Sequence, residues 1–140
     1  MTPAGAAWAR HQLWLVHHKR AKDLDMQVKI KIMPIVREKD GLAMSSRNVY
    51  LNPQERAQAL CIYKSLKLAQ RLFNKGERNA KKIIKRMSQL INENRKADIE
   101  YIAIIDAEEL RDMKRISGQA MVSVAVKIGN TRLIDNVILN

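Results

Sequence analysis

The stretch AMVSVAVKIGNTRLIDNVIL, residues 120–139, decides the fold. Every second residue from Val122 to Ile128 is a large aliphatic one and the residues between them are smaller or polar, which is the period of a strand with one buried face. Gly129 and Asn130 are typical of a tight turn, and a second apolar run follows them. We therefore predict an antiparallel hairpin that forms one side of a core.

A third strand and two helices precede this hairpin in the sequence. The run DIEYIAIID at 98–106 predicts the strand. The first helix, 52–75, opens with Asn52 as a cap and with Glu55 at the capping-box position. Its apolar residues recur every three or four positions, as they also do in a second helix at 79–92. Both helices are therefore predicted to bury one face.

These elements predict a small α+β domain at residues 36–140, with a three-stranded, mainly antiparallel sheet and two main helices. Residues 1–35 follow another pattern, because the spacing of their apolar residues predicts a helix at 6–24 and a strand at 28–33. A helix followed by a strand, with no strand before it, is typical of the end of an α/β unit. We predict residues 1–35 to be the remnant of a separate α/β domain.

The chain is strongly basic, with 26 Lys and Arg against 14 Asp and Glu and a net charge of +12. Nine basic residues and one acidic residue lie between Lys64 and Arg86. Such a field favours anionic partners, and a nucleic-acid-binding module is one alternative. The aromatic content of 4% and the absence of a recognised nucleic-acid motif speak against it. We interpret the basic run as a solvated helix face and expect no specific nucleic acid as a partner.

Other classes of protein fit the composition poorly. No run approaches the roughly 18 apolar residues that a membrane helix needs, so we expect no membrane partner. The three His and the one Cys lack the spacing of a zinc site, and no metal ligand is predicted. Cys61 is the only cysteine and is assigned to the core. A reducing, cytoplasmic compartment is the expectation.

The loop DGLAMSSRN, residues 40–48, has a composition that suits a ligand. Ser45 and Ser46 offer adjacent hydroxyls, and the planar fork of Arg47 matches phosphate oxygens. Gly41 lets the backbone turn so that N–H groups can face an anion. A loop held only by local hydrogen bonds is the alternative.

The segment PIVREKDGLAMSSRNVYLNPQER at 34–56, together with RLIDN at 132–136, resembles the pantothenate synthetase family over about residues 11–139. The resemblance implies an enzyme that uses ATP and magnesium to convert pantoate to pantoyl adenylate, from which β-alanine displaces AMP. The family's nucleotide-binding fold is similar to that of class I aminoacyl-tRNA synthetases. Residues 1–35 would then be the remnant of a Rossmann-like domain.

The resemblance also implies roles for individual residues. Met44, Ser45, Ser46 and Arg47 match the family's ATP-binding stretch. Val36 matches a position that contacts the adenine part through its backbone, and Gln12 matches a pantoate-binding glutamine. No catalytic nucleophile and no protein ligand for Mg²⁺ are implied, because the enzyme positions its substrates and stabilises developing charge.

The sequence departs from the family at its start. In the family's Gly-x-Lys-Asp-x-x-Gln pattern, Trp8 replaces the lysine and Ala9 replaces the aspartate. The family's His-x-Gly-His motif occurs nowhere in the 140 residues. The opening residues thus read like sequence that has replaced the natural lead-in, by truncation, by a frameshift or by design. We therefore expect half of the ATP site and most of the pantoate site to be missing, and the isolated chain to be inactive.

A folded remnant without chemistry is the competing interpretation. Helix 6–24 carries apolar side chains that would ordinarily pack against a larger sheet, namely Trp8, Leu13, Trp14 and Val16. Left without that sheet, they would form an exposed apolar patch. We therefore predict self-association through this helix, as a homodimer.

Overall fold

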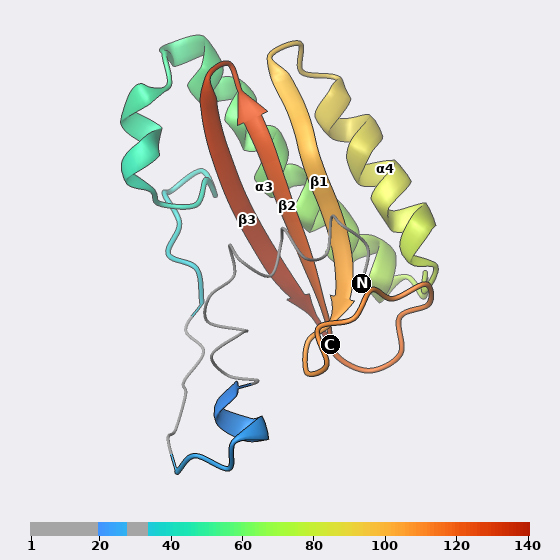
Figure 1. Cartoon of the computed structure of the whole chain (residues 1–140). Coiled ribbons are helices and arrows are strands. Elements are labelled where there is room, and N and C mark those ends of the chain that lie inside the picture. The colour runs from blue at the N-terminus through green and yellow to red at the C-terminus, as the bar shows by residue number, and fades with distance from the viewer. Residues whose placement is uncertain (1–19, 28–33) are drawn as a thin grey trace.

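The computed structural model describes residues 20–27 and 34–140. A 3₁₀ helix, η1 (Ser46–Tyr50), precedes the two long helices, α3 (Pro53–Asn74) and α4 (Ala80–Asn92). Three strands follow, β1 (Ala97–Asp106), β2 (Ala120–Ile128) and β3 (Thr131–Leu139) (Figure 1).

The three strands form one antiparallel sheet in the order β1-β2-β3. The tight turn between β2 and β3 pairs Ile128 with Thr131, and Gly129 there adopts a φ of 57°. Positive φ is a conformation that glycine reaches without a steric penalty. The predicted hairpin and the α+β class are thus confirmed. β2 is the central strand, and only Lys127 in it is exposed.

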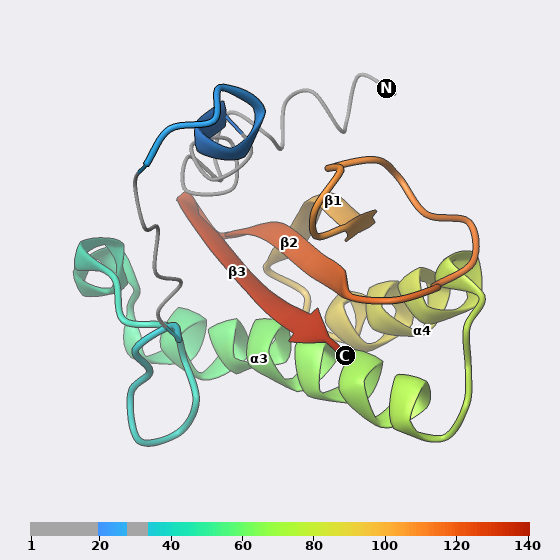
Figure 2. The same cartoon turned by 90° about the horizontal axis from the view of Figure 1, so that it is seen from below.

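Helices α3 and α4 lie side by side and cover one face of the sheet (Figure 2). The core lies between these two layers, and its largest fully buried members include Ile62 and Leu66 of α3, Ile83 and Met87 of α4, and Val122 of β2. Burying each such side chain contributes about 1.5–3 kcal/mol of transfer free energy. The layer packing therefore rests on the apolar stripes that the sequence pattern indicated.

Local interactions fix the start of each long helix. The Asn52 side chain accepts a hydrogen bond from the Glu55 amide (2.8 Å), and the Glu55 carboxylate accepts one from the Asn52 amide (3.2 Å). This reciprocal pair is the predicted capping box. Asn79 caps α4 by accepting a hydrogen bond from the Lys82 amide (3.1 Å). Both helix starts therefore agree with the prediction to within one residue.

Two features differ from the sequence predictions or lie outside the described residues. Residues 46–50, predicted to be in or beside an irregular loop, form η1, because Ser45 caps the turn by accepting a hydrogen bond from the Arg47 amide (3.2 Å). Of the helix predicted at 6–24, only residues 20–24 fall in the described part, and residues 20–23 of these are helical. The strand predicted at 28–33 lies outside it. The two-domain division and the homodimer stay predictions.

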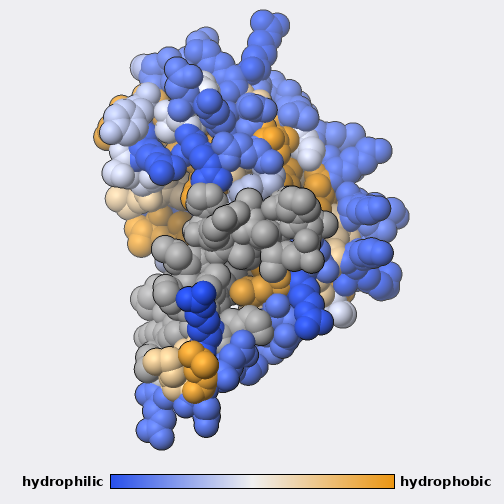
Figure 3. Space-filling view, in the orientation of Figure 1, coloured by the Kyte–Doolittle hydropathy of each residue, from blue (hydrophilic) through white to orange (hydrophobic). Residues whose placement is uncertain are grey.

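Much of the polar surface lies on the outer faces of the helices. Hydrophilic residues dominate the edge formed by α4 in the space-filling view (Figure 3). Eight of the nine basic residues between Lys64 and Arg86 are exposed, in line with a solvated helix face. In the described part of the chain, no helix is long and apolar enough to span a membrane.

Candidate functional site

Residues 36–44 form a small β-like loop beside the sheet. The Met44 amide donates to the Val36 carbonyl (2.9 Å), and the Glu38 amide donates to the Leu42 carbonyl (2.8 Å). Arg37 and Ala43 face each other as an antiparallel bridge between these two bonds. The loop turns at Gly41, whose φ is 102°. Hydrogen bonds within the segment therefore hold its backbone in place.

Two arginines tie this loop to the rest of the domain. Arg37 donates from Nη1 to Asp135 Oδ2 (2.6 Å) and from Nη2 to Asp135 Oδ1 (2.9 Å), a two-pronged ion pair with β3. Arg56 of α3 donates to Glu38 (2.8 Å) and Asp40 (3.0 Å). Charge-assisted forks of this kind fix orientation as well as distance.

The pKa values of the carboxyl groups in these ion pairs shift in opposite directions. Burial raises the pKa of the Asp135 carboxyl, although the hydrogen bond from Arg37 opposes the shift. Hydrogen bonding to Arg56 lowers the pKa of Glu38 and of Asp40, which lie at the surface. The exposed end of the loop is thus held by ionised carboxylates at neutral pH, and the inner end is held by a desolvated pair.

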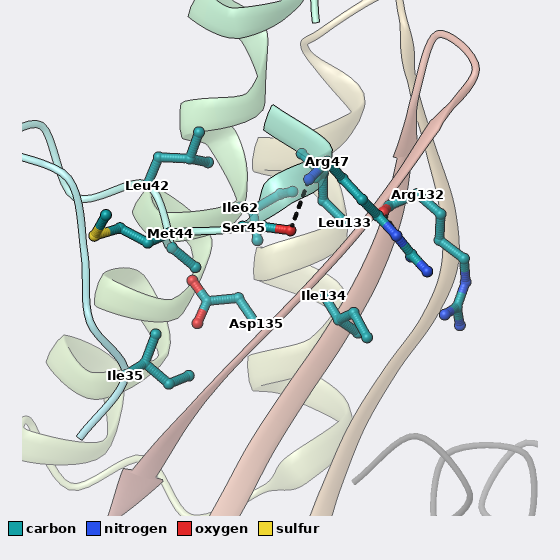
Figure 4. Close-up of a pocket in the computed structure, with 11 residues that line it drawn as sticks. Ile35, Leu42, Met44, Ser45, Arg47, Ile62, Arg132, Leu133, Ile134 and Asp135 are labelled. Atoms are coloured by element: carbon teal, nitrogen blue, oxygen red, sulfur yellow. Dashed lines mark hydrogen bonds between the residues drawn. The ribbon is translucent and has the colours of Figure 1, made fainter. Parts of the chain in front are cut away.

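The start of η1 brings two more arginines together. Arg47 donates from Nη1 to the Arg132 carbonyl on β3 (3.2 Å). Arg132 in turn pairs with Glu100 of β1. The side chains of Arg47 and Arg132 run beside each other at the edge of the sheet (Figure 4). Two guanidinium groups against the one carboxylate of Glu100 leave a net positive charge here, which would attract an anion.

A cavity of about 260 Å³ lies between the loop and β3 (Figure 4). Apolar side chains form much of its wall, and polar and charged groups complete it, as in many small-molecule sites. The lining residues are Ile35, Leu42, Ala43, Met44, Ser45, Arg47, Ile62, Arg132, Leu133, Ile134 and Asp135. This mixture can accept a molecule that has both an apolar surface and an anionic group.

The structure brings together only some of the predicted site residues. Met44, Ser45 and Arg47 line the cavity. Ser46 does not line it and is exposed in the first turn of η1. Val36 also lies off the cavity, with its side chain 68% exposed and its carbonyl bonded to Met44. Gln12 lies outside the described residues.

Sequence reasoning assigned no role to Asp135 or Arg132. Asp135 stands in the row of β3 residues that faces the helices, between Leu133 and Val137, and it is 3% exposed. A carboxylate between two aliphatic residues of the same strand face was the signal for Asp135, because buried charges are rare unless they are paired. Arg132 had no comparable signal, because its place beside Arg47 follows from the packing of η1 against β3.

The described residues contain no group of three or more His, Cys, Asp or Glu side chains placed to hold a metal ion. Cys61 is buried, and burial raises the pKa of its thiol to about 11. A thiol in that state is inert at neutral pH. Its assignment to the core is therefore confirmed.

Comparisons with known proteins agree on one family. The sequence profile described as Pantoate-beta-alanine ligase matches residues 10–138. A pantothenate synthetase of Acetivibrio thermocellus is 51% identical over 121 residues, which are 86% of this chain and 43% of that protein. One of Thermotoga petrophila is 48% identical over 128 residues, which are 91% of this chain and 46% of that protein.

Solved structures give the same result. The pantothenate synthetase of Thermus thermophilus superposes with a TM-score of 0.81 at 32% identity, over 91% of this chain and 46% of that one. The pantoate-beta-alanine ligase of Francisella tularensis shares the fold, with a TM-score of 0.55 at 23% identity. This chain thus spans less than half the length of the relatives it matches.

Proposed function

Because this chain belongs to the pantoate-beta-alanine ligase family, we propose that it takes part in the ATP-dependent joining of pantoate and β-alanine, as the part that carries the phosphate-binding loop. One observation carries the proposal. The loop residues Met44, Ser45 and Arg47 line one cavity together with Arg132 of β3. Sequence resemblance suggested the first three, and the fold adds a further cation beside them.

The chemistry proposed is adenylate formation followed by acyl transfer. The pantoate carboxylate attacks the α-phosphorus of ATP, and pyrophosphate leaves with the bonding electron pair. The amine of β-alanine then attacks the activated carbonyl, and AMP leaves. Arg47 and the serine hydroxyls stabilise the charge that develops on the pyrophosphate, since fixed donors cost little reorganisation during the reaction.

The residues of the loop are proposed to contact two parts of ATP, its phosphates and its adenine. Arg47 can present its planar guanidinium to two phosphate oxygens. The Ser45 oxygen accepts a hydrogen bond from the Arg47 amide, which leaves its hydroxyl proton available for an oxygen of the ligand. Ser46, exposed at the start of η1, is proposed to meet the same phosphates from outside the cavity. Val36 is proposed to contact the adenine through its backbone.

Magnesium does not fit the protein groups of this cavity. Among the described residues that line the cavity, Asp135 is the one with a carboxylate, and both of its oxygens accept hydrogen bonds from Arg37. We therefore propose that Mg²⁺ enters bound to the ATP phosphates, without a protein ligand in the described residues.

The 140 residues are proposed to be inactive alone. Trp8 and Ala9 replace a cation and a carboxylate of the family pattern, and the His-x-Gly-His motif is absent from this sequence. A nucleotide-binding domain supplied by a second chain would restore these groups. Gln12 is proposed to contact pantoate in that complete enzyme.

Release of AMP from ATP, pantoate and β-alanine tests the proposal, with and without an added N-terminal pantothenate synthetase domain. We expect activity only with the added domain. Arg47→Met should abolish it, whereas Arg71→Met, which removes the same charge from the exposed face of α3, should leave it unchanged. Silence in both conditions would refute the catalytic role and leave a folded, oligomerising remnant.

A further inference from the structure

We propose that Arg37 and Asp135 act as a clamp, a pair of positioning residues that holds the phosphate loop in the conformation able to bind its ligand. The inference deepens the proposed function and rests on it. The sequence resemblance assigned no role to Arg37 or Asp135, and neither was proposed above to bind phosphate.

The guanidinium of Arg37 is committed to the protein. Besides its fork with Asp135, Nη1 donates to the Gly41 carbonyl (3.1 Å) and Nη2 lies 3.4 Å from the Asn136 carbonyl. Four acceptors thus surround a group that has five N–H donors. Arg37 is therefore a poor candidate for a phosphate ligand, even though it lies next to the predicted ATP-binding stretch.

The same guanidinium packs on an aromatic ring of α3. Its central carbon lies 4.9 Å from the centroid of the Tyr63 ring. Gly41 packs closely against this ring as well, because a Cβ atom built at Gly41 would lie 2.2 Å from the Tyr63 ring carbons. The loop therefore contacts β3 through Asp135 and α3 through Tyr63. Cation–π contacts of this kind add to the strength of the ion pair.

The clamp connects the loop directly to the cavity. Asp135 forms part of the cavity wall, and Arg37 lies in the loop strand that pairs with Ala43. Met44, Ser45 and Arg47 follow Ala43 at once, so the clamp fixes the strand from which they extend. A buried charge is costly unless its partner stays in place. Loss of either partner should therefore release the loop.

Hydrogen exchange measures this release without any ligand. The amides of Glu38, Gly41 and Met44 all donate to carbonyls within the loop. We expect Arg37→Gln and Asp135→Asn each to raise the exchange rate of these three amides by about tenfold or more, since contacting residues couple by amounts of that size. Amides of α4 should keep their rates.

A matched control separates positioning from general stability. Arg78 resembles Arg37, because it donates to the carbonyls of Phe73 (2.6 Å) and Glu77 (3.0 Å) and stacks on the Phe73 ring at 3.8 Å. It lies at the other end of α3, far along the chain from the loop. Arg78→Gln should lower global stability but leave exchange in the loop unchanged.

Binding of Mg-ATP to the full chain, measured by calorimetry in the presence of the added N-terminal pantothenate synthetase domain, completes the test. Arg37→Gln should weaken binding about tenfold or more, and Arg78→Gln should not change it. Unchanged loop exchange in both clamp variants overturns the proposal, and so does faster exchange with undiminished Mg-ATP affinity. Absence of Mg-ATP binding to the wild type even with the added domain instead refutes the phosphate-binding role of the loop. In that case, loop exchange alone confirms or refutes the clamp.

Discussion

Replacing Gly41 with alanine should destabilise the protein more than the same change at Gly76. Both glycines have a similar positive φ, 102° at Gly41 and 97° at Gly76. They differ in their surroundings, because a Cβ at Gly41 would lie 2.2 Å from Tyr63 ring carbons, whereas a Cβ at Gly76 would meet nothing within 4 Å. The pair therefore separates backbone strain from steric conflict.

The expected magnitudes follow from these two terms. Positive φ costs an L-residue about 1–2 kcal/mol, and alanine regains up to about 1 kcal/mol by restricting the unfolded chain, so Gly76→Ala should cost about 1 kcal/mol. Gly41→Ala carries the same strain plus an overpacking cost of about 1–3 kcal/mol. The ring cannot move freely, since it also contacts the guanidinium of Arg37.

Urea unfolding followed by circular dichroism measures both costs, provided that the slope of the transition stays the same. Repeating the change at Gly41 in a Tyr63→Ala background removes the ring, and the cost of Gly41→Ala should then fall to that of Gly76→Ala. Equal costs in the wild-type background would refute the reasoning, as would an excess that persists without the ring.

Three further predictions concern the helices and the loop. Asn52→Ala should cost about 1 kcal/mol in urea unfolding, because it removes the cap of α3, and Asn74→Ala at the other end of the helix should cost less. Cys61 should resist a thiol reagent at pH 8 in the native protein and react once per chain in denaturant, because burial raises its pKa to about 11. Arg56→Met should lower stability at neutral pH, and this deficit should vanish in acid. The pKa values of Glu38 and Asp40 lie below their ordinary 4.5 and 3.8, so their contribution is present above those values and is lost as the pH falls further; a deficit that stays constant from pH 7 to pH 3 would contradict this account.

The sequence was sufficient where structure depends on neighbours along the chain. Asn52 and Glu55 are three residues apart, so their capping box could be predicted from spacing alone. The turn at Gly129 and Asn130 and the alternation in β2 likewise predicted the hairpin. The motif at residues 44–47 predicted a phosphate-binding role for the loop, because the chemistry of serine and arginine suits phosphate wherever the loop lies, and that role stays a prediction.

The tertiary structure decided which residues share the cavity. Arg37 and Asp135 are 98 residues apart, and Arg47 and Arg132 are 85 apart. Nothing in a local pattern sets such pairings, because they follow from the packing of α3 against the sheet and from the register of β3. The same packing left Val36 and Ser46 off the cavity, although they belong to the same motif as Arg47. Periodicity specifies which face of an element is buried, whereas the partner of a charged side chain depends on where the elements meet in space.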